Sequence, residues 1–191
     1  MKYNHLKVLI KSDLSRLSPP SKWNCLKRLL FNASFKITFW YRVCGYFKSK
    51  KSLFFKFIYH ISYIIYKHNQ YLTGIQLPVT TQIGKGLTFA HFSNIVIAST
   101  AIMGDNIIIY NGVTVGTVHG HKGAPTIGNN VVLYTGCKVL GNITIGSNVV
   151  IGANAVVTKD IPDNSVAVGI PAKVISDKGR EYFSLITNRI D

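Results

Sequence analysis

Three of the six histidines lie where a regular sequence pattern is interrupted, and they are the residues of this chain best suited to proton transfer. His91 stands in TFAHFSN at 88–94, and His119 and His121 stand in GTVHGHKGAPT at 116–126. An imidazole, with an unperturbed pKa of about 6.5, can take a proton from a hydroxyl group and give it to a leaving group. His91 is therefore the first candidate for acid–base chemistry, and the other three histidines, at 5, 60 and 68, are expected on the surface of helices.

The cysteines offer neither a metal site nor a disulfide framework. Cys25, Cys44 and Cys137 are widely separated and lack the spacing of metal ligands. No cysteine or serine is obviously paired with a base, so no covalent nucleophile is expected. We predict three ordinary buried thiols and no metal ion.

The interrupted pattern is a repeat of six residues that begins at Ile83. It places an apolar residue first and a small or apolar residue fifth, and it runs without a slip from 127 to 156. A period of six fits neither an amphipathic helix nor a single hairpin, so it predicts short strands stacked in coils. Glycine and asparagine after the strands permit positive φ at the corners. The small or apolar fifth positions include Leu87, Ala101, Ile107, Val113, Val131, Cys137, Ile143, Val149 and Ala155.

Two interruptions break this repeat. Phe89 and Ile97 are eight residues apart instead of six, so two extra residues are expected to bulge near His91. Between Val115 and Ile127, a loop at 117–126 replaces most of one unit. Loops that leave a regular scaffold are common places for functional sites.

The N-terminal part has a different composition and predicts helices. Apolar residues cover most of segment 53–67 around a narrow stripe of polar and basic ones, and a second helix is expected over 29–47, after a break at 18–21. Residues 1–82 hold fourteen lysines and arginines against the single acid Asp13. No nucleic-acid motif accompanies them, so we expect no nucleic-acid partner. No apolar run reaches the roughly 20 residues of a membrane span and no secretory signal stands at the start, which favours a cytoplasmic protein.

The repeat, the ending VTKDIPDNSVAVGIPAKVI at 157–175 and the segment YLTGIQLPVTTQIGKGLTFAH at 71–91 resemble the hexapeptide-repeat acyltransferases, in particular their serine acetyltransferase branch. The resemblance implies a mainly β fold, a left-handed parallel β-helix of triangular section behind an α-helical N-terminal region. The expected divisions are a basic helical region at 1–74, the β-helix at 75–175 with its extruded loop, and a tail at 176–191.

The same resemblance implies an enzyme that transfers an acetyl group directly from acetyl-CoA. His91 is implied as the general base, with His119 and His121 as possible supporting residues. A homotrimer is expected, with acetyl-CoA in a groove between subunits. By position in the motif, the expected CoA-binding residues are Gly116, Thr135, Gly136, Gly152, Ala153, Lys159 and Lys173.

The acceptor is where the chain departs from that branch. Serine acetyltransferases generally carry an Asp before the histidine, an Asp-Ile-His-Pro segment and an Asp-Arg-His-Pro segment, whereas this chain has Ala90, Gln76-Leu77-Pro78 and 122–125 as KGAP. Losing those charges favours a sugar hydroxyl of a capsule, exopolysaccharide or O-antigen unit, a glycan or lipid-linked sugar held by Phe89, Phe92 and Tyr110. The basic helices would then dock on an anionic membrane surface. The alternatives are a serine O-acetyltransferase with a divergent pocket, a sugar N-acetyltransferase and a non-catalytic trimeric scaffold.

Overall fold

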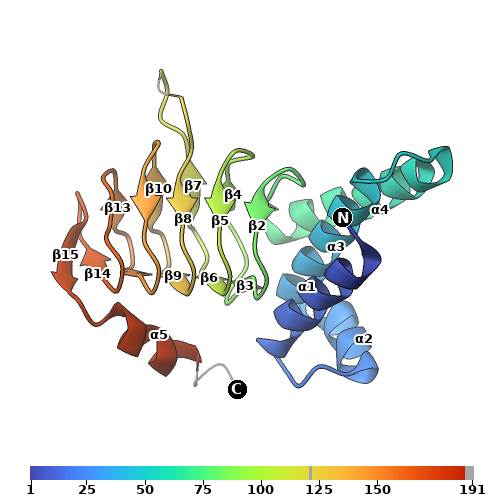
Figure 1. Cartoon of the computed structure of the whole chain (residues 1–191), viewed down its shortest axis with the longest axis horizontal. Coiled ribbons are helices and arrows are strands. Elements are labelled where there is room, and N and C mark those ends of the chain that lie inside the picture. Colours follow the sequence, from blue (N-terminus) through green and yellow to red (C-terminus); the bar gives the residue numbers. More distant parts are fainter. Residues whose placement is uncertain (121, 188–191) are drawn as a thin grey trace.

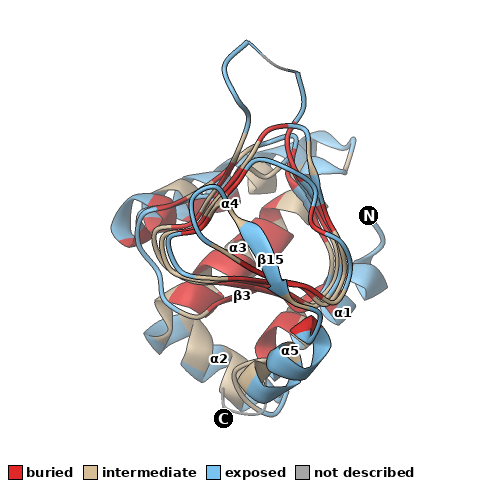
Figure 2. Cartoon of the chain, turned by 90° about the vertical axis from the view of Figure 1, so that its left-hand side faces the viewer, coloured by how far each residue is buried: buried red, intermediate tan, exposed pale blue. Residues whose placement is uncertain are grey.

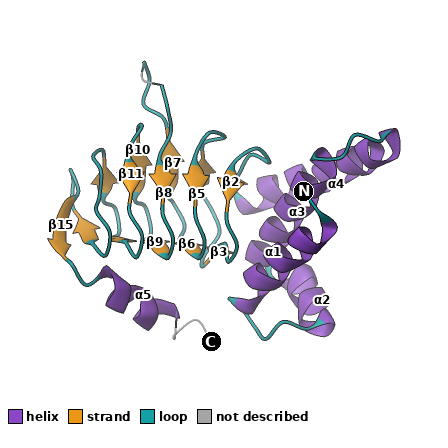
Figure 3. Ribbon diagram, in the orientation of Figure 1, coloured by secondary structure: helices purple, strands orange, loops and turns teal. Residues whose placement is uncertain are grey.

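The computed structural model describes residues 1–120 and 122–187 and consists of a helical region followed by a solenoid of short strands (Figure 1). The helical region comprises α1 (Tyr3–Ser15), α2 (Lys22–Phe31), α3 (Ala33–Lys48) and α4 (Leu53–Thr73). A further helix, α5 (Gly179–Thr187), follows the last strand. Helices gather at one end of the molecule and strands at the other, with α5 lying alongside the solenoid (Figure 3).

The strands form three parallel sheets, and viewed along the solenoid they enclose a triangle (Figure 2). Sheet A has the order β1-β4-β7-β10-β13, sheet B β11-β8-β5-β2, and sheet C β15-β14-β12-β9-β6-β3, in which only the terminal β15 is antiparallel. The predicted β-helix behind a helical region is therefore confirmed. The strand bounds are β1 Ile75–Gln76, β2 Gln82–Ile83, β3 Thr88–Phe89, β4 Ile95–Ile97, β5 Ile102–Met103, β6 Ile107–Ile109, β7 Thr114–Gly116, β8 Thr126–Ile127, β9 Val131–Leu133, β10 Lys138–Leu140, β11 Thr144–Ile145, β12 Val150–Ile151, β13 Val156–Val157, β14 Val166–Val168 and β15 Lys173–Ser176.

The six-residue period places the same side chains inside every coil. All nine predicted fifth positions are buried except Ile143, which is partly buried. Inside sheet B, like residues stack coil upon coil as Ile83, Met103, Ile127, Ile145 and Ile161. Each coil thus covers the apolar edge of the next, which a single coil could not bury alone.

One corner of the triangle is built from a ladder of asparagines. Asn106, Asn130, Asn148 and Asn164 all adopt positive φ, between 57° and 59°. Each of the first three donates its side-chain amide to the next asparagine carbonyl at 2.9, 2.9 and 3.0 Å. Asparagine tolerates this backbone region better than most residues, and the ladder satisfies amides that the stacked coils would otherwise bury unpaired.

The helical region shares its core with the solenoid. Ile37, Tyr41, Cys44 and Tyr66 belong to the same buried cluster as the solenoid interior. Tyr66 donates its hydroxyl to the Leu77 carbonyl, at the start of the first coil, at 2.5 Å. The helices therefore close the end of the solenoid and hide its first coil from water.

Three sequence expectations about the elements need correction. The helix expected over 29–47 is two helices, because Asn32 breaks it and its side chain accepts from the backbone of Phe35 at 2.8 Å as the N-cap of α3. The tail at 176–191 contains the helix α5. Its apolar side chains pack against the outer face of sheet C. Cys25 is only half-buried, unlike Cys44 and Cys137. No helix among the described residues is long and apolar enough to cross a bilayer.

Candidate active site

His91 lies at the corner where the chain passes from sheet C to sheet A. Strand β3 pairs Phe89 with Ile109, and β4 pairs Ile97 with Val115, so eight residues of this coil match six of the next. The two extra residues form the bulge that the spacing predicts. Ser93 and Asn94 adopt φ of 107° and 52°, a strained turn that leaves His91 exposed to solvent.

Aromatic side chains support the His91 ring. His91 meets Tyr110 edge to face, with ring centroids 5.7 Å apart and planes at 61°. Tyr110 in turn stacks on Tyr134 at 4.8 Å. Burial raises the pKa of the Tyr110 hydroxyl, so the phenol stays neutral at physiological pH. Phe183 and Ile186 of α5 pack against the same cluster, which links the C-terminal helix to the corner.

The aromatic residues expected to hold an acceptor divide into two groups. Phe92, in the bulge, is 47% exposed, and Tyr110 is half-buried beside His91, so both can contact a ligand at the corner. Phe89 is 1% exposed and points into the solenoid core. The expectation that Phe89 contacts the acceptor is therefore wrong, because the position just before the corner faces inward in every coil.

Small residues occupy the same corner in the coils that follow the coil of His91. Gly112 donates to the Ser93 carbonyl at 3.0 Å, Gly136 to Asn111 at 2.9 Å and Asn154 to Thr135 at 2.9 Å, which stacks the four coils in register. Four of the predicted CoA-binding residues lie here, namely Thr135, Gly136, Gly152 and Ala153. The predicted column of small side chains thus leads away from the candidate base.

Two of these glycines also have a packing reason to be glycine. A Cβ on Gly136, whose φ is +75°, would lie 2.0 Å from the side-chain oxygen of Asn154. A Cβ on Gly152 would lie 2.6 Å from a methyl group of Val168. A side chain at either position would force Asn154 or Val168 of the neighbouring coil to shift, whether or not a ligand binds.

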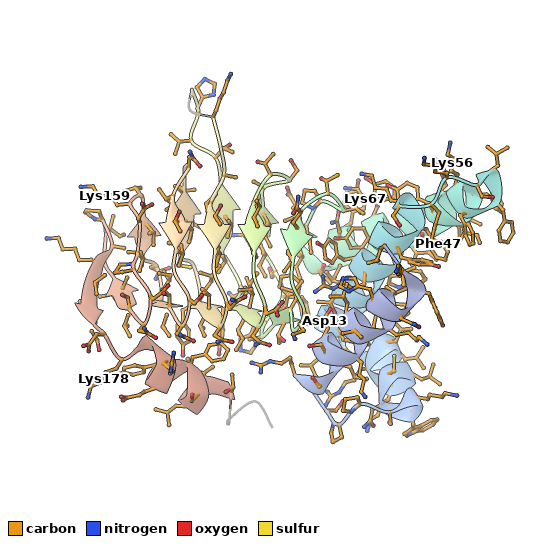
Figure 4. The ribbon with its side chains drawn as sticks, viewed as in Figure 1. Asp13, Phe47, Lys56, Lys67, Lys159 and Lys178 are labelled. Atoms are coloured by element: carbon orange, nitrogen blue, oxygen red, sulfur yellow. The ribbon has the colours of Figure 1, made fainter. Side chains whose placement is uncertain are left out.

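The remaining predicted residues lie elsewhere. Gly116 ends β7, at the opposite corner of sheet A, where the extruded loop leaves the solenoid (Figure 1). Lys159 is exposed and follows β13 at that corner (Figure 4). Lys173 begins β15 at the far end. His119 is exposed in the loop, and His121 lies outside the described residues. A strand of sheet A lies between the two corners, so the loop that carries His119 leaves the solenoid at a different corner from that of His91.

Three further residues in the coils stacked at this corner are not apparent from the linear sequence. Asn111 accepts from the Thr135 hydroxyl at 3.1 Å, and the Lys138 ammonium group donates to the Gly112 carbonyl at 2.5 Å. Tyr134 is the third. Aligning the coils on their corners, so that 91, 111, 135 and 153 coincide, would have brought them together. The loop insertion conceals that register in the linear sequence.

The repeat of this chain is similar to that of known bacterial transferases. The family described as "Bacterial transferase hexapeptide (six repeats)" matches residues 124–159. A serine acetyltransferase of Synechococcus elongatus is 37% identical over 84% of this chain and 64% of its own length, and one of Staphylococcus xylosus is 42% identical over 69% and 62%. Residues 124–159 therefore carry the repeat of this transferase family, and the chain is similar to serine acetyltransferases over most of its own length. It spans slightly under two thirds of the length of these curated relatives.

The likeness to solved structures includes the helical region as well as the solenoid. Neisseria gonorrhoeae serine acetyltransferase in complex with serine superposes with a TM-score of 0.74 at 28% identity, covering 91% of this chain and 70% of that one. Soybean serine acetyltransferase gives a TM-score of 0.74 at 27% identity, covering 90% and 69%. The solenoid and the helices before it therefore have a common arrangement in these proteins.

These relatives overturn the expectation of a capsule, exopolysaccharide or O-antigen acceptor. A sugar acceptor was expected because charges are missing at Ala90, Gln76 and the loop. That step was too strong, because a small zwitterion can also be held by backbone groups and uncharged polar side chains, so missing charges do not exclude serine.

Proposed function

We propose that this chain is an acetyl-CoA-dependent serine O-acetyltransferase. The observation that carries the proposal is an exposed histidine on a bulge of the hexapeptide solenoid, in a chain whose similar proteins are named serine acetyltransferase over most of its length. The neighbour solved with serine, and a further one described as a complex with CoA, support the same donor and acceptor.

In the proposed reaction, His91 is the general base. Its imidazole takes the proton of the serine hydroxyl while that oxygen forms a bond to the thioester carbonyl carbon of acetyl-CoA. The tetrahedral intermediate collapses with cleavage of the carbon–sulfur bond, and the CoA thiolate leaves with the proton that the imidazolium returns. The products are O-acetylserine and CoA, and no covalent enzyme intermediate is required. Acetyl-CoA would be held at this corner by Thr135, Gly136, Gly152 and Ala153.

We further propose a homotrimer in which each site is shared. Gly116, Lys159 and the base of the loop that carries His119 lie at a different corner of sheet A from His91 of the same chain. A second copy, with its loop corner against the first copy's histidine corner, would complete the groove. His121 and Lys173 keep their proposed supporting and CoA-binding roles in that assembly.

Thiol release from acetyl-CoA tests the function directly. L-serine should support turnover, and His91→Ala should lower kcat/KM about a hundredfold or more, the size expected for a general base. His60→Ala, which removes an exposed histidine of α4, is the matched control and should leave the rate unchanged. Turnover with an amino sugar or glycan but not with serine would refute the acceptor, and an unaffected His91→Ala would refute the base.

Mixing experiments test the shared site. Unfolding and refolding His91→Ala together with a variant lacking loop 117–126 should restore part of the activity, since some sites receive one intact half from each parent. Light scattering should give three times the 21.2 kDa chain mass. A fully active monomer, or no recovery in trimers shown to be mixed, would contradict the arrangement.

A further inference from the structure

The outer half of α4 exposes an apolar face that no residue among 1–120 and 122–187 covers. The helix projects beyond the rest of the molecule at the end away from the solenoid (Figure 1). Exposure there ranges from 47% at Ile61 to 81% at Leu53, and the face comprises Leu53, Phe54, Phe57, Ile61 and Ile64. We call these five residues the α4 tip face. Contiguous exposed apolar patches on soluble proteins usually mark a binding surface.

Lysines flank the α4 tip face. Lys48, Lys51 and Lys56 are exposed around the turn from α3 to α4, and Figure 4 shows Lys56 near the outer end of the helix. Lys50 lies 4.6 Å above the ring of Tyr46 in the same turn. The tip therefore joins a large apolar surface to a cluster of positive charge.

The positive charge is not balanced within the helical region. Asp13 is the single acid among residues 1–82, against fourteen lysines and arginines. It is 1% exposed and its carboxylate is bound by Arg42 at 2.9 Å. All the accessible charged side chains of residues 1–82 are therefore cationic, so the whole region carries a positive field.

We infer that the α4 tip face docks on an anionic lipid bilayer. Two copies meeting through this face would bring two cationic surfaces together, which is unfavourable. A nucleic acid would neutralise the lysines but leave the phenylalanines in water. An anionic bilayer matches both features, since the apolar side chains enter the headgroup boundary while the lysines meet lipid phosphates.

The geometry suits binding at the interface. Residues 53–64 form about three helical turns, roughly 18 Å long, which fits a helix lying in the boundary and is too short to span the hydrocarbon core. The interior half of α4 is attached to the solenoid by the hydrogen bond from Tyr66 to Leu77. The inference is independent of the proposed acceptor and would hold for any reaction at the His91 corner.

Vesicle co-sedimentation of the full chain tests this inference. Vesicles of phosphatidylcholine alone are compared with vesicles containing phosphatidylglycerol in addition. The protein should sediment with the anionic vesicles, and binding should weaken as salt increases because the lysine contribution is screened. Equal recovery in the supernatant with both vesicle types would overturn the inference.

Two pairs of variants locate the contact. Phe54→Ser with Phe57→Ser should reduce partitioning at least tenfold, since each buried phenyl ring contributes substantially. Lys51→Gln with Lys56→Gln should reduce it about fivefold per lysine. The controls are Ile175→Ser, which removes an apolar side chain about as exposed as Phe54 and Phe57, and Lys159→Gln, which removes an exposed lysine. Both lie on the solenoid, so these variants should bind vesicles like the parent.

Light scattering on the same proteins tests whether a second copy of the chain, instead of a bilayer, covers the α4 tip face. The parent and Phe54→Ser/Phe57→Ser should have the same mass, because the tip does not join copies. A larger parent assembly that the variant halves would overturn the bilayer in favour of a second copy. Binding to duplex DNA with an affinity equal to that for anionic vesicles, unaffected by Phe54→Ser/Phe57→Ser, would overturn it in favour of nucleic acid.

Discussion

At the residue scale, the position of His91 was predictable and its surroundings were not. Counting residues between Phe89 and Ile97 revealed the bulge, because the six-residue period is strict enough for a departure of two to be visible. The aromatic side chains that pack beside His91 could not be predicted from spacing. Tyr110 and Tyr134 are 24 residues apart only because the extruded loop lengthens one coil, and they meet because corners stack.

The edge-to-face contact predicts that the Tyr110 ring positions His91. Tyr110→Leu removes the ring, so the imidazole should sample other rotamers and kcat should fall about tenfold with KM for acetyl-CoA little changed. Tyr110→Phe keeps the ring and should stay within about twofold of the parent. NMR of labelled histidine should show the His91 resonance moving in the Leu variant through loss of the ring current. An unmoved resonance would show that the ring does not position His91.

The cysteines give a prediction that needs no knowledge of the reaction. Burial raises the pKa of Cys44 to about 11 and of Cys137 to about 12. At pH 8 both are protonated and enclosed, so native protein should expose only Cys25 to a thiol reagent, slowly, because burial raises its pKa as well. Urea should release the other two. Three fast thiols in the native state would contradict the described packing.

At the element scale, the strand pattern was legible but the interactions between coils were not. Asparagine after a strand predicted positive φ, which the ladder residues adopt. Their side-chain chain of hydrogen bonds requires coils to stack in register, which is a tertiary property. Helix α5 was not predicted because it also depends on tertiary contacts. Its Phe183 and Ile186 pack against apolar side chains on the outer face of sheet C, namely Ile108, Val132, Val150 and Val166.

Substitutions at Asn130 separate the two roles of the ladder. Asn130→Gly loses both side-chain hydrogen bonds but accepts a φ of 57°, whereas Asn130→Ala loses the bonds and strains the backbone. We expect the alanine variant to be less stable than the glycine variant by about 1 kcal/mol, the cost of the left-handed region. Urea unfolding measures both. If alanine is the more stable of the two, backbone strain is not what selects asparagine at this corner.

At the scale of the whole molecule, the helices and the solenoid are joined by a buried polar latch. Arg42 on α3 binds Asp13 on α1 and donates to the carbonyls of Ile83 and Gly84 in the first coil, at 2.7 and 2.5 Å. The Asp13 carboxylate also accepts from the backbone of Leu87 at 2.9 Å. The sequence showed Asp13 as an isolated acid in a basic segment, and no spacing rule connects it to residues 29 and 74 positions away.

This latch predicts a large stability effect from one substitution. Arg42→Met leaves the Asp13 carboxylate buried without its counter-charge, which should lower the free energy of unfolding by about 3–5 kcal/mol. Asp13→Leu with Arg42→Met removes both charges, so the double variant should lose less than the sum of the single variants, by at least about 1 kcal/mol. Lys85→Met, which breaks the exposed pair with Asp105, is the control and should cost under about 1 kcal/mol. Urea unfolding followed by circular dichroism measures all four variants. Strictly additive losses at Asp13 and Arg42 would mean that the two side chains act separately and that their ion pair does not join the helices to the solenoid.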